Sequence, residues 1–101
     1  MHHIEFADEA QEDFEQSIRW YRERSFQAAE NFVTAIEETL DLIAKHPHQF
    51  KNTRGGYHEA IVQSYPFTLV YRIIEAEKLI AVSAVHHQSR HPKRKFRKRK
   101  S

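Results

Sequence analysis

The hydrophobic periodicity of this chain changes once, and the change sets narrow limits on its fold. Up to about residue 44 the apolar side chains recur every three or four positions, which is the spacing of a helix that buries one face. From residue 57 to residue 87 the period becomes two, which is the spacing of β-strands. With 101 residues, a chain of this pattern has room for one small α+β domain.

The helical part divides into two helices. Asp8 and Gln11 have the spacing of a capping box, which predicts that the first helix begins there. Ser25 is the predicted N-cap of the second helix, which should end at His46-Pro47 because proline disfavours helical geometry in the residue before it. The short connection between them predicts an antiparallel hairpin. The second helix carries the clearest apolar stripe of the chain, formed by Ala29, Phe32, Val33, Ile36, Leu40 and Ile43.

The part with period two should form a sheet. We expect a short strand at residues 2–6 and three more at residues 57–65, 67–74 and 79–87, with a polar turn at residues 75–78. The order is therefore β-α-α-β-β-β, and we predict an α+β fold, an antiparallel sheet with the helical hairpin packed on one face. Neither layer can bury its apolar residues alone, so the stripe of the second helix should pack against the sheet.

The charges are distributed unevenly along the chain. The formal net charge is +2, yet residues 93–100 hold seven of the sixteen Lys and Arg residues and no acid. Residues 1–44 hold eleven acids and three bases. We therefore divide the chain into a folded domain, residues 1–92, and a basic tail, residues 93–101. A basic cluster attracts any polyanion regardless of its sequence, so the tail predicts a polyanionic partner without identifying it.

The composition and the apolar runs disfavour several classes of protein. The absence of cysteine removes disulfides, thiolate catalysis and cysteine-ligated zinc. The longest nearly apolar run, Leu79–Val85, is far too short to cross a bilayer, and the first residues lack the pattern of a signal peptide. His86 and His87 would point to opposite faces of a strand, so they would not share a metal ion. We expect a cytoplasmic protein without membrane association, metal or cofactor.

Five short segments, spread from the first helix to the end of the last strand, form a recognisable set: Trp20-Tyr21, Ile43-Ala44-x-His46-Pro47, Arg54-Gly55-Gly56, Tyr65-Pro66-Phe67-Thr68-Leu69-Val70-Tyr71-Arg72 and Ala84-Val85-His86-His87-Gln88-Ser89-Arg90-His91-Pro92. In this order and spacing they resemble the RelE/ParE superfamily of bacterial toxins, from about residue 4 to residue 94. The resemblance implies the same fold and a growth-inhibiting toxin of a type II toxin–antitoxin system, as in plasmid stabilization. It also implies a cognate antitoxin, a small DNA-binding protein that lays a helix or strand along the toxin. An exposed apolar groove is therefore expected beside the helical hairpin.

The superfamily has two branches with different targets. The ParE branch poisons DNA gyrase by binding it, and the RelE branch cleaves mRNA on the ribosome with its own side chains. The pair His87-Gln88 resembles the ParE ending, and Thr68 stands where RNA-cleaving relatives commonly carry an arginine that contacts phosphate. The resemblance therefore favours a gyrase-binding toxin. The alternatives are a ribosome-dependent, metal-independent endoribonuclease of the RelE kind, and an inactive relative that serves only as a binding module.

The candidate site residues follow from these activities. RNA cleavage through the 2′-hydroxyl needs a base, an acid and a cation for the added phosphate charge. Histidine suits acid–base work at neutral pH, although each histidine here has the alternative of being an idle polar residue in a loop or at a strand end. The candidates are His87, Arg90 and Arg72 for catalysis in a nuclease, and Arg54, His87, Gln88, Arg90, Lys93, Arg94 and Arg97 for binding of the target.

Overall fold

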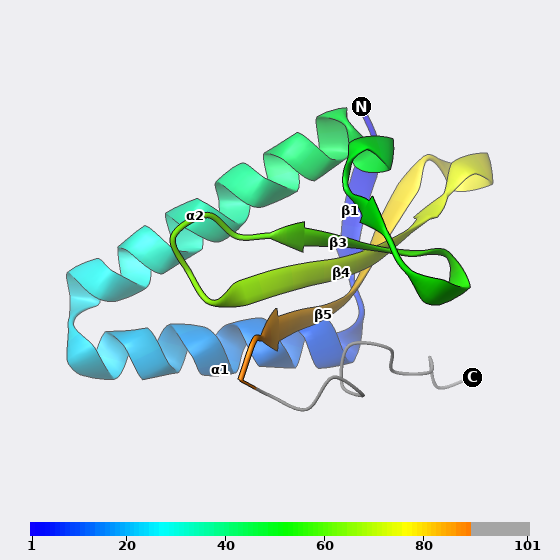
Figure 1. Cartoon of the computed structure of the whole chain (residues 1–101). Coiled ribbons are helices and arrows are strands. Elements are labelled where there is room, and N and C mark those ends of the chain that lie inside the picture. The colour runs from blue at the N-terminus through cyan, green and yellow to red at the C-terminus, as the bar shows by residue number, and fades with distance from the viewer. Residues whose placement is uncertain (90–101) are drawn as a thin grey trace.

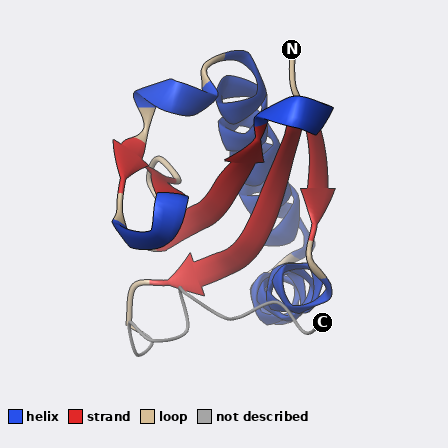
Figure 2. Ribbon diagram, turned by 90° about the vertical axis from the view of Figure 1, so that its right-hand side faces the viewer, coloured by secondary structure: helices blue, strands red, loops and turns tan. Residues whose placement is uncertain are grey.

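The computed structural model describes residues 1–89. Two long helices, α1 (Asp8–Arg24) and α2 (Phe26–Lys45), form a hairpin that covers one face of a sheet (Figure 1, Figure 2). The predicted α+β fold is confirmed, with one additional strand of two residues. The strands are β1 (His3–Phe6), β2 (Lys51–Asn52), β3 (Tyr57–Ile61), β4 (Phe67–Ile74) and β5 (Leu79–His87), and the short 3-10 helices between them are η1 (Pro47–Gln49), η2 (Arg54–Gly56) and η3 (Glu75–Glu77).

The sheet is mixed, whereas the sequence pattern predicts an antiparallel one. The strand order is β1-β5-β4-β3-β2, and β2 to β5 pair antiparallel with their neighbours. The exception is β1, which runs parallel to β5, with His3 opposite Leu79 and Phe6 opposite Val82. Parallel pairing needs a long connection, and the helices and strands between β1 and β5 supply it. The alternation of side chains carries no information about strand direction, so this part of the prediction was wrong.

Local sequence signals predict the helix boundaries correctly, with one exception at the start of α1. The N-cap of α2 is Ser25, as predicted, and its Oγ accepts a hydrogen bond from the backbone N–H of Ala28 at 2.9 Å. The helix ends at Lys45, directly before His46-Pro47. The capping box at Asp8 is not formed: Ala7 is the N-cap of α1 and makes no side-chain cap bond. Asp8 is instead the first helical residue, and the positive end of the helix dipole stabilises its carboxylate there.

The strand β3 ends earlier than predicted, at Ile61 instead of residue 65. The chain turns over residues 62–65, where Ser64 has a positive φ of 70° and the Tyr65 N–H donates to the Val62 carbonyl at 3.2 Å. The Val62 N–H then donates to the Phe67 carbonyl at 2.9 Å, which closes the hairpin of β3 and β4. This turn brings Tyr65 and Pro66 to the end of the sheet that lies near the last turns of α1.

The core lies between the sheet and the helical hairpin, as predicted. Phe32, Ile36 and Ile43 of the predicted stripe of α2 belong to this core, and Leu40 packs against it partly buried. Ala29 and Val33 lie outside this cluster. Aromatic rings extend the core toward the end of α1, where the rings of Phe32 and Tyr21 stack at 4.8 Å. The largest fully buried side chains of α2 and β4 are Phe32, Ile36, Ile43, Leu69, Val70 and Tyr71.

A β-bulge divides β5 into two parts. Val70 of β4 lies opposite Ala84, but the next residue, Tyr71, lies opposite Val82, so Ser83 has no partner across the ladder. The Ser83 Oγ donates a hydrogen bond to the Val70 carbonyl at 3.2 Å, which closes the bulge. Because side chains alternate along a strand, the extra residue changes which later side chains face the helices.

Candidate target-binding site

A pocket of about 420 Å³ opens where the last turns of α1 meet the beginning of β4 and the end of β5. Three of the five segments that resemble the toxin superfamily meet here, although they are far apart in the sequence. The floor includes Phe67, which is 4% exposed, and one wall is Trp20, which is 50% exposed. The lining residues are Ser17, Trp20, Tyr21, Pro66, Phe67, His87 and Ser89. An exposed indole beside a buried ring gives the pocket an apolar character suited to a protein side chain.

His87 supplies the polar group of this pocket. Its ring lies edge-on to the ring of Phe67, with 5.0 Å between centroids. Its Nδ1 accepts a hydrogen bond from the Ser89 backbone N–H at 3.1 Å, and the Ser89 hydroxyl lies 2.7 Å from the same nitrogen. A backbone N–H can only donate, so Nδ1 is the acceptor and the neutral ring carries its proton on Nε2. The free side of the ring therefore offers a hydrogen-bond donor.

The wall formed by Trp20 is fixed by its neighbours. The Arg24 guanidinium carbon lies 3.3 Å from the centroid of the indole, and Arg24 Nη1 donates to the Trp20 carbonyl at 2.9 Å. The ring of Tyr21 meets the indole edge-on at 4.9 Å. A cation over the face of an indole is attracted by the ring quadrupole. Trp20 is therefore exposed and at the same time held in one orientation, as a preorganised contact surface requires.

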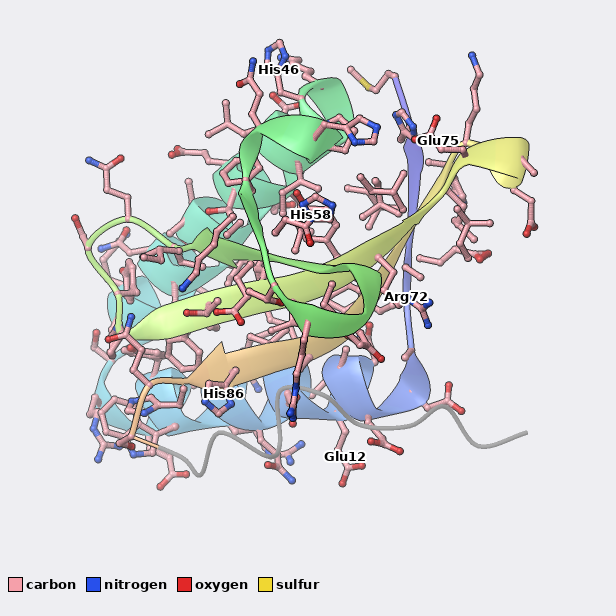
Figure 3. All side chains as sticks on the ribbon, turned by 45° about the vertical axis from the view of Figure 1, so that its right-hand side comes forward. Glu12, His46, His58, Arg72, Glu75 and His86 are labelled. Atoms are coloured by element: carbon pink, nitrogen blue, oxygen red, sulfur yellow. The ribbon has the colours of Figure 1, made fainter. Side chains whose placement is uncertain are left out.

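The structure separates two of the predicted catalytic residues. His87 lies opposite Phe67 on the face that the helices cover, whereas Arg72 alternates with the core residue Tyr71 and projects from the other face. Arg72 lies five positions after Phe67 in β4, which is about 17 Å along the strand. The Arg72 guanidinium carbon instead lies 5.2 Å from the centroid of the Tyr57 ring. Figure 3 labels Arg72. Arg72 and His87 therefore do not form one site.

The remaining predicted residues fall into three groups. Gln88 lies between the pocket residues His87 and Ser89 in the sequence and is exposed, and its N–H donates to the Pro66 carbonyl at 2.9 Å. Arg54 begins η2, directly before Tyr57 and β3, so it belongs with Arg72 to the other end of the sheet. The candidates outside the described residues are Arg90, Lys93, Arg94 and Arg97.

Two other histidines, His58 and His86, are buried away from the pocket. His58 is buried, stacks on Tyr71 with 5.3 Å between ring centroids, and its Nδ1 donates to the Phe50 carbonyl at 3.1 Å. His86 is 3% exposed and faces away from the helices, opposite Thr68 (Figure 3). Neither side chain reaches the pocket, because both His58 and His86 are held elsewhere by the register of the sheet.

A cluster of His2, His48 and Glu75 was not foreseen from the sequence. His48 Nε2 lies 3.1 Å from a Glu75 carboxylate oxygen, and His2 Nε2 lies 3.5 Å from the same oxygen. The hydrogen bond from His48 lowers the pKa of the Glu75 carboxyl. The residue before β1 meets residues of η1 and η3 here, and no local pattern connects them. Within residues 1–89, no three histidine or acidic side chains are arranged to hold a metal ion.

A second surface feature is a groove of about 300 Å³ between α1 and α2. Apolar and polar side chains line it together, and it includes the ring of Phe26, which is 70% exposed. Its lining residues are Ile18, Arg22, Phe26, Ala29, Glu30, Val33 and Thr34. The expected groove beside the hairpin is therefore present. No helix within the described range is long and apolar enough to span a bilayer.

Comparison with known proteins identifies the family. A model described as the ParE toxin of the type II toxin–antitoxin system, parDE, matches residues 4–92. The chain belongs to the ParE toxin family. No curated protein sequence matches it. Three of the five segments that resemble this family line the pocket around His87, which agrees with the assignment.

Solved structures of two toxin–antitoxin systems share this ParE fold. The chromosomal ParDE system from P. aeruginosa has a TM-score of 0.72 at 15% identity, covering 86% of this chain and 96% of that one. The intact E. coli RelBE toxin–antitoxin complex has a TM-score of 0.58 at 18% identity, covering 89% and 100%. The isolated E. coli RelE toxin has a TM-score of 0.59 at 15% identity, covering 91% and 89%. At these identities the likeness concerns the fold, which both branches share.

Proposed function

We propose that this ParE-family toxin inhibits growth by binding DNA gyrase in the cytoplasm, and that the pocket around His87 contacts the target. The proposal rests mainly on the hydrogen bonds made by the ring nitrogen Nδ1 of His87. Ser89 occupies its Nδ1, so the neutral ring presents a donor and has no lone pair free to accept a proton from an RNA hydroxyl. A fixed donor within apolar walls suits recognition of a protein segment.

The separation of Arg72 from His87 supports the same choice. A nuclease needs its acid–base group and its phosphate-binding cation within reach of one scissile bond. Arg72 projects from the other face of the sheet, about 17 Å along β4, so it cannot serve a bond held at His87. Thr68 also leaves that strand without the arginine of the RNA-cleaving relatives. Binding without cleavage is therefore the activity that fits the described residues best.

We also infer that a cognate antitoxin docks in the groove between α1 and α2. The groove combines the apolar side chains of Ile18, Phe26 and Val33 with Arg22 and Glu30, which is the kind of surface that takes an amphipathic helix. The ring of Phe26 lines the groove and is 70% exposed. Burial of this ring by a partner would remove apolar surface from water. The basic tail, residues 93–101, would add contacts to a polyanionic target such as gyrase-bound DNA.

The test of target choice uses purified toxin and two assays. Inhibition of supercoiling by purified gyrase should be seen with the wild type, and His87→Ala should weaken it by about tenfold or more, because the substitution removes both the donor and the contact with Phe67. His3→Ala, a matched change on the exposed strand β1, should act like the wild type. Ribosome-dependent mRNA cleavage that is lost in His87→Ala would overturn the gyrase proposal and leave the family assignment standing.

A further inference from the structure

Two groups beside the pocket favour a negatively charged ligand. The neutral His87 ring offers the hydrogen on Nε2, because Nδ1 accepts the Ser89 N–H at 3.1 Å. The Arg24 guanidinium carbon lies 3.3 Å from the centroid of the Trp20 indole, and this indole lines the pocket. A positive charge therefore lies against the pocket wall, and the described residues that line the pocket include no acid.

Arg24 has more hydrogen-bond donors than its own helix uses. Its Nη1 donates to the Trp20 carbonyl at 2.9 Å, and this bond holds the guanidinium over the indole. Arg24 is exposed to solvent, so a ligand can reach its remaining N–H groups, whose planar arrangement matches a carboxylate. Burial and Tyr65 raise the pKa of Tyr21, whereas the charge of Arg24 opposes this rise. The charge of Arg24 therefore acts on a second residue of the pocket.

The distribution of charge along α1 gives the pocket end of the molecule a basic character. The first turn of α1 carries two acids and no base, whereas its last turn carries Arg22 and Arg24 with one acid, Glu23. The sequence that follows the pocket residues adds seven Lys and Arg residues and no acid, at positions 93–100. Charge complementarity would therefore steer an acidic partner to the end of α1 that borders the pocket.

The other walls of the pocket favour an apolar side chain over a phosphate group. Phe67 is 4% exposed, and the volume of about 420 Å³ falls within the range of ligand pockets. An apolar side chain between Trp20 and Phe67 would remove apolar surface from water, whereas a hydrated phosphate would not. The pocket thus combines an apolar cavity with positive charge at its wall.

We propose that the pocket binds an acidic peptide segment, in which an apolar side chain lies between Trp20 and Phe67 and neighbouring carboxylates face His87 and Arg24. The identification of this segment as a part of gyrase rests on the function proposed above. The chemistry of the ligand rests on the pocket alone.

The only tryptophan of the chain is Trp20, so its fluorescence reports directly on the occupation of the pocket. The probe is a blocked tripeptide, aspartate–phenylalanine–aspartate, and the matched control peptide has asparagine in place of both aspartates. The acidic peptide should bind about tenfold more tightly at low ionic strength, which corresponds to one hydrogen bond to a charged group. Added salt should reduce this difference. Equal affinities, or no response to either peptide up to about 10 mM, would overturn the proposal.

Variants of α1 test whether the preference arises at the pocket. Arg24→Gln removes the charge beside Trp20 and should lower the preference for the acidic peptide by about threefold. Arg22→Gln removes the same charge from the same turn but lies in the groove between the helices, so it should keep the full preference. An equal loss in both variants would indicate a general effect of net charge and overturn the proposal.

A nucleotide tests the alternative that the pocket takes nucleic acid. Thymidine monophosphate combines an aromatic ring, which can stack on Trp20, with a phosphate that Arg24 can bind. It should change the fluorescence of Trp20 only at concentrations above those of the acidic peptide. Tighter binding of the nucleotide than of the acidic peptide would overturn the proposal in favour of a nucleic-acid site.

Supercoiling by purified gyrase separates this inference from the function on which it builds. If both hold, the acidic peptide at saturation should relieve the inhibition caused by the toxin, and the neutral peptide should not. Binding of the acidic peptide to a toxin that does not inhibit gyrase would refute the proposed function and leave the chemistry of the ligand standing. Inhibition that the bound acidic peptide does not relieve would overturn the identification of the segment with gyrase.

Discussion

At the scale of single residues, Tyr71 connects the middle of the sheet to the turn after α2. Its ring is fully buried, and its hydroxyl donates a hydrogen bond to the Pro47 carbonyl at 2.6 Å. Burial raises the pKa of Tyr71 to about 12, since the phenolate would lose its hydration inside the protein. The hydroxyl therefore remains a donor at any pH near neutrality, and the turn at Pro47 stays attached to β4.

Tyr71→Phe should test this connection through the pH dependence of stability. The folded pKa of Tyr71 is raised above its ordinary value of 10.0, so its contribution is fully present below pH 10 and is lost as the pH rises through about 12. The substitution should cost about 0.5–1.5 kcal/mol at neutral pH for the lost hydrogen bond. It should also reduce the alkaline loss of stability, as measured by urea unfolding. Parallel pH curves for the two proteins would contradict this, and Tyr57→Phe serves as the control.

At the scale of elements, the helical hairpin has one surface that packs in the core and another that is exposed to water. One face of α2 contributes Phe32, Ile36 and Ile43 to the core, whereas the groove between α1 and α2 leaves the ring of Phe26 in contact with water. Phe26 begins α2 directly after the cap residue Ser25, at the point where the two helices turn toward each other. An aromatic residue in that position contributes little to the core, so its exposure is best explained by a partner.

Phe26→Ala should separate stability from antitoxin binding. Because the ring is 70% exposed, its removal should change the free energy of unfolding by no more than about 0.5 kcal/mol. The affinity for the antitoxin should fall by about tenfold or more if Phe26 is an anchor in the groove. Titration calorimetry with the purified antitoxin measures the effect. Leu42→Ala, at 52% exposure on the same helix but outside the groove, is the control, and equal affinities for the two variants would argue against docking there.

The elements also show how far the sequence alone can lead. Ser25 and His46-Pro47 act on their own neighbours, so they predict both ends of α2 correctly. The direction of β1 and the bulge at Ser83 depend on contacts with distant residues, and no local pattern contains them. For the candidate site, His87 was singled out through a family resemblance, but its surroundings were not predicted. The role of Trp20 as a pocket wall depends on how α1 lies against β5, which periodicity leaves open.

At the scale of the whole molecule, the first strand depends on the last. Among the strands of the described range, β1 pairs only with β5, and β5 fills the position between β1 and β4 (Figure 1). The N–H of Ala7 also donates to the Val82 carbonyl at 2.9 Å, directly before α1 begins. Without β5 the sheet would be split, and the apolar faces of α1 and β1 would remain uncovered.

A fragment of residues 1–78 should therefore not fold, although it contains both helices and four of the five strands. It lacks β5, the strand that joins β1 to the rest of the sheet, so its thermal unfolding followed by circular dichroism should show no cooperative transition. A fragment of residues 1–92 should unfold cooperatively like the full chain, because it contains every described element. A cooperative transition in the shorter fragment would mean that β5 is an accessory strand.

The parallel pairing of β1 with β5 has a consequence for synthesis in the cell. The ribosome synthesises the chain from its amino end, so β1 is made long before β5. Because β1 pairs with β5, β1 cannot join the sheet until β5 has been synthesised. Nascent chains that stop before β5 lack both the completed sheet and the histidine of the pocket, and they expose apolar surface that proteases recognise. Prematurely terminated products should therefore be harmless and short-lived. If the protein inhibits growth as proposed, the inhibition should follow the number of completed chains and not the number of chains begun.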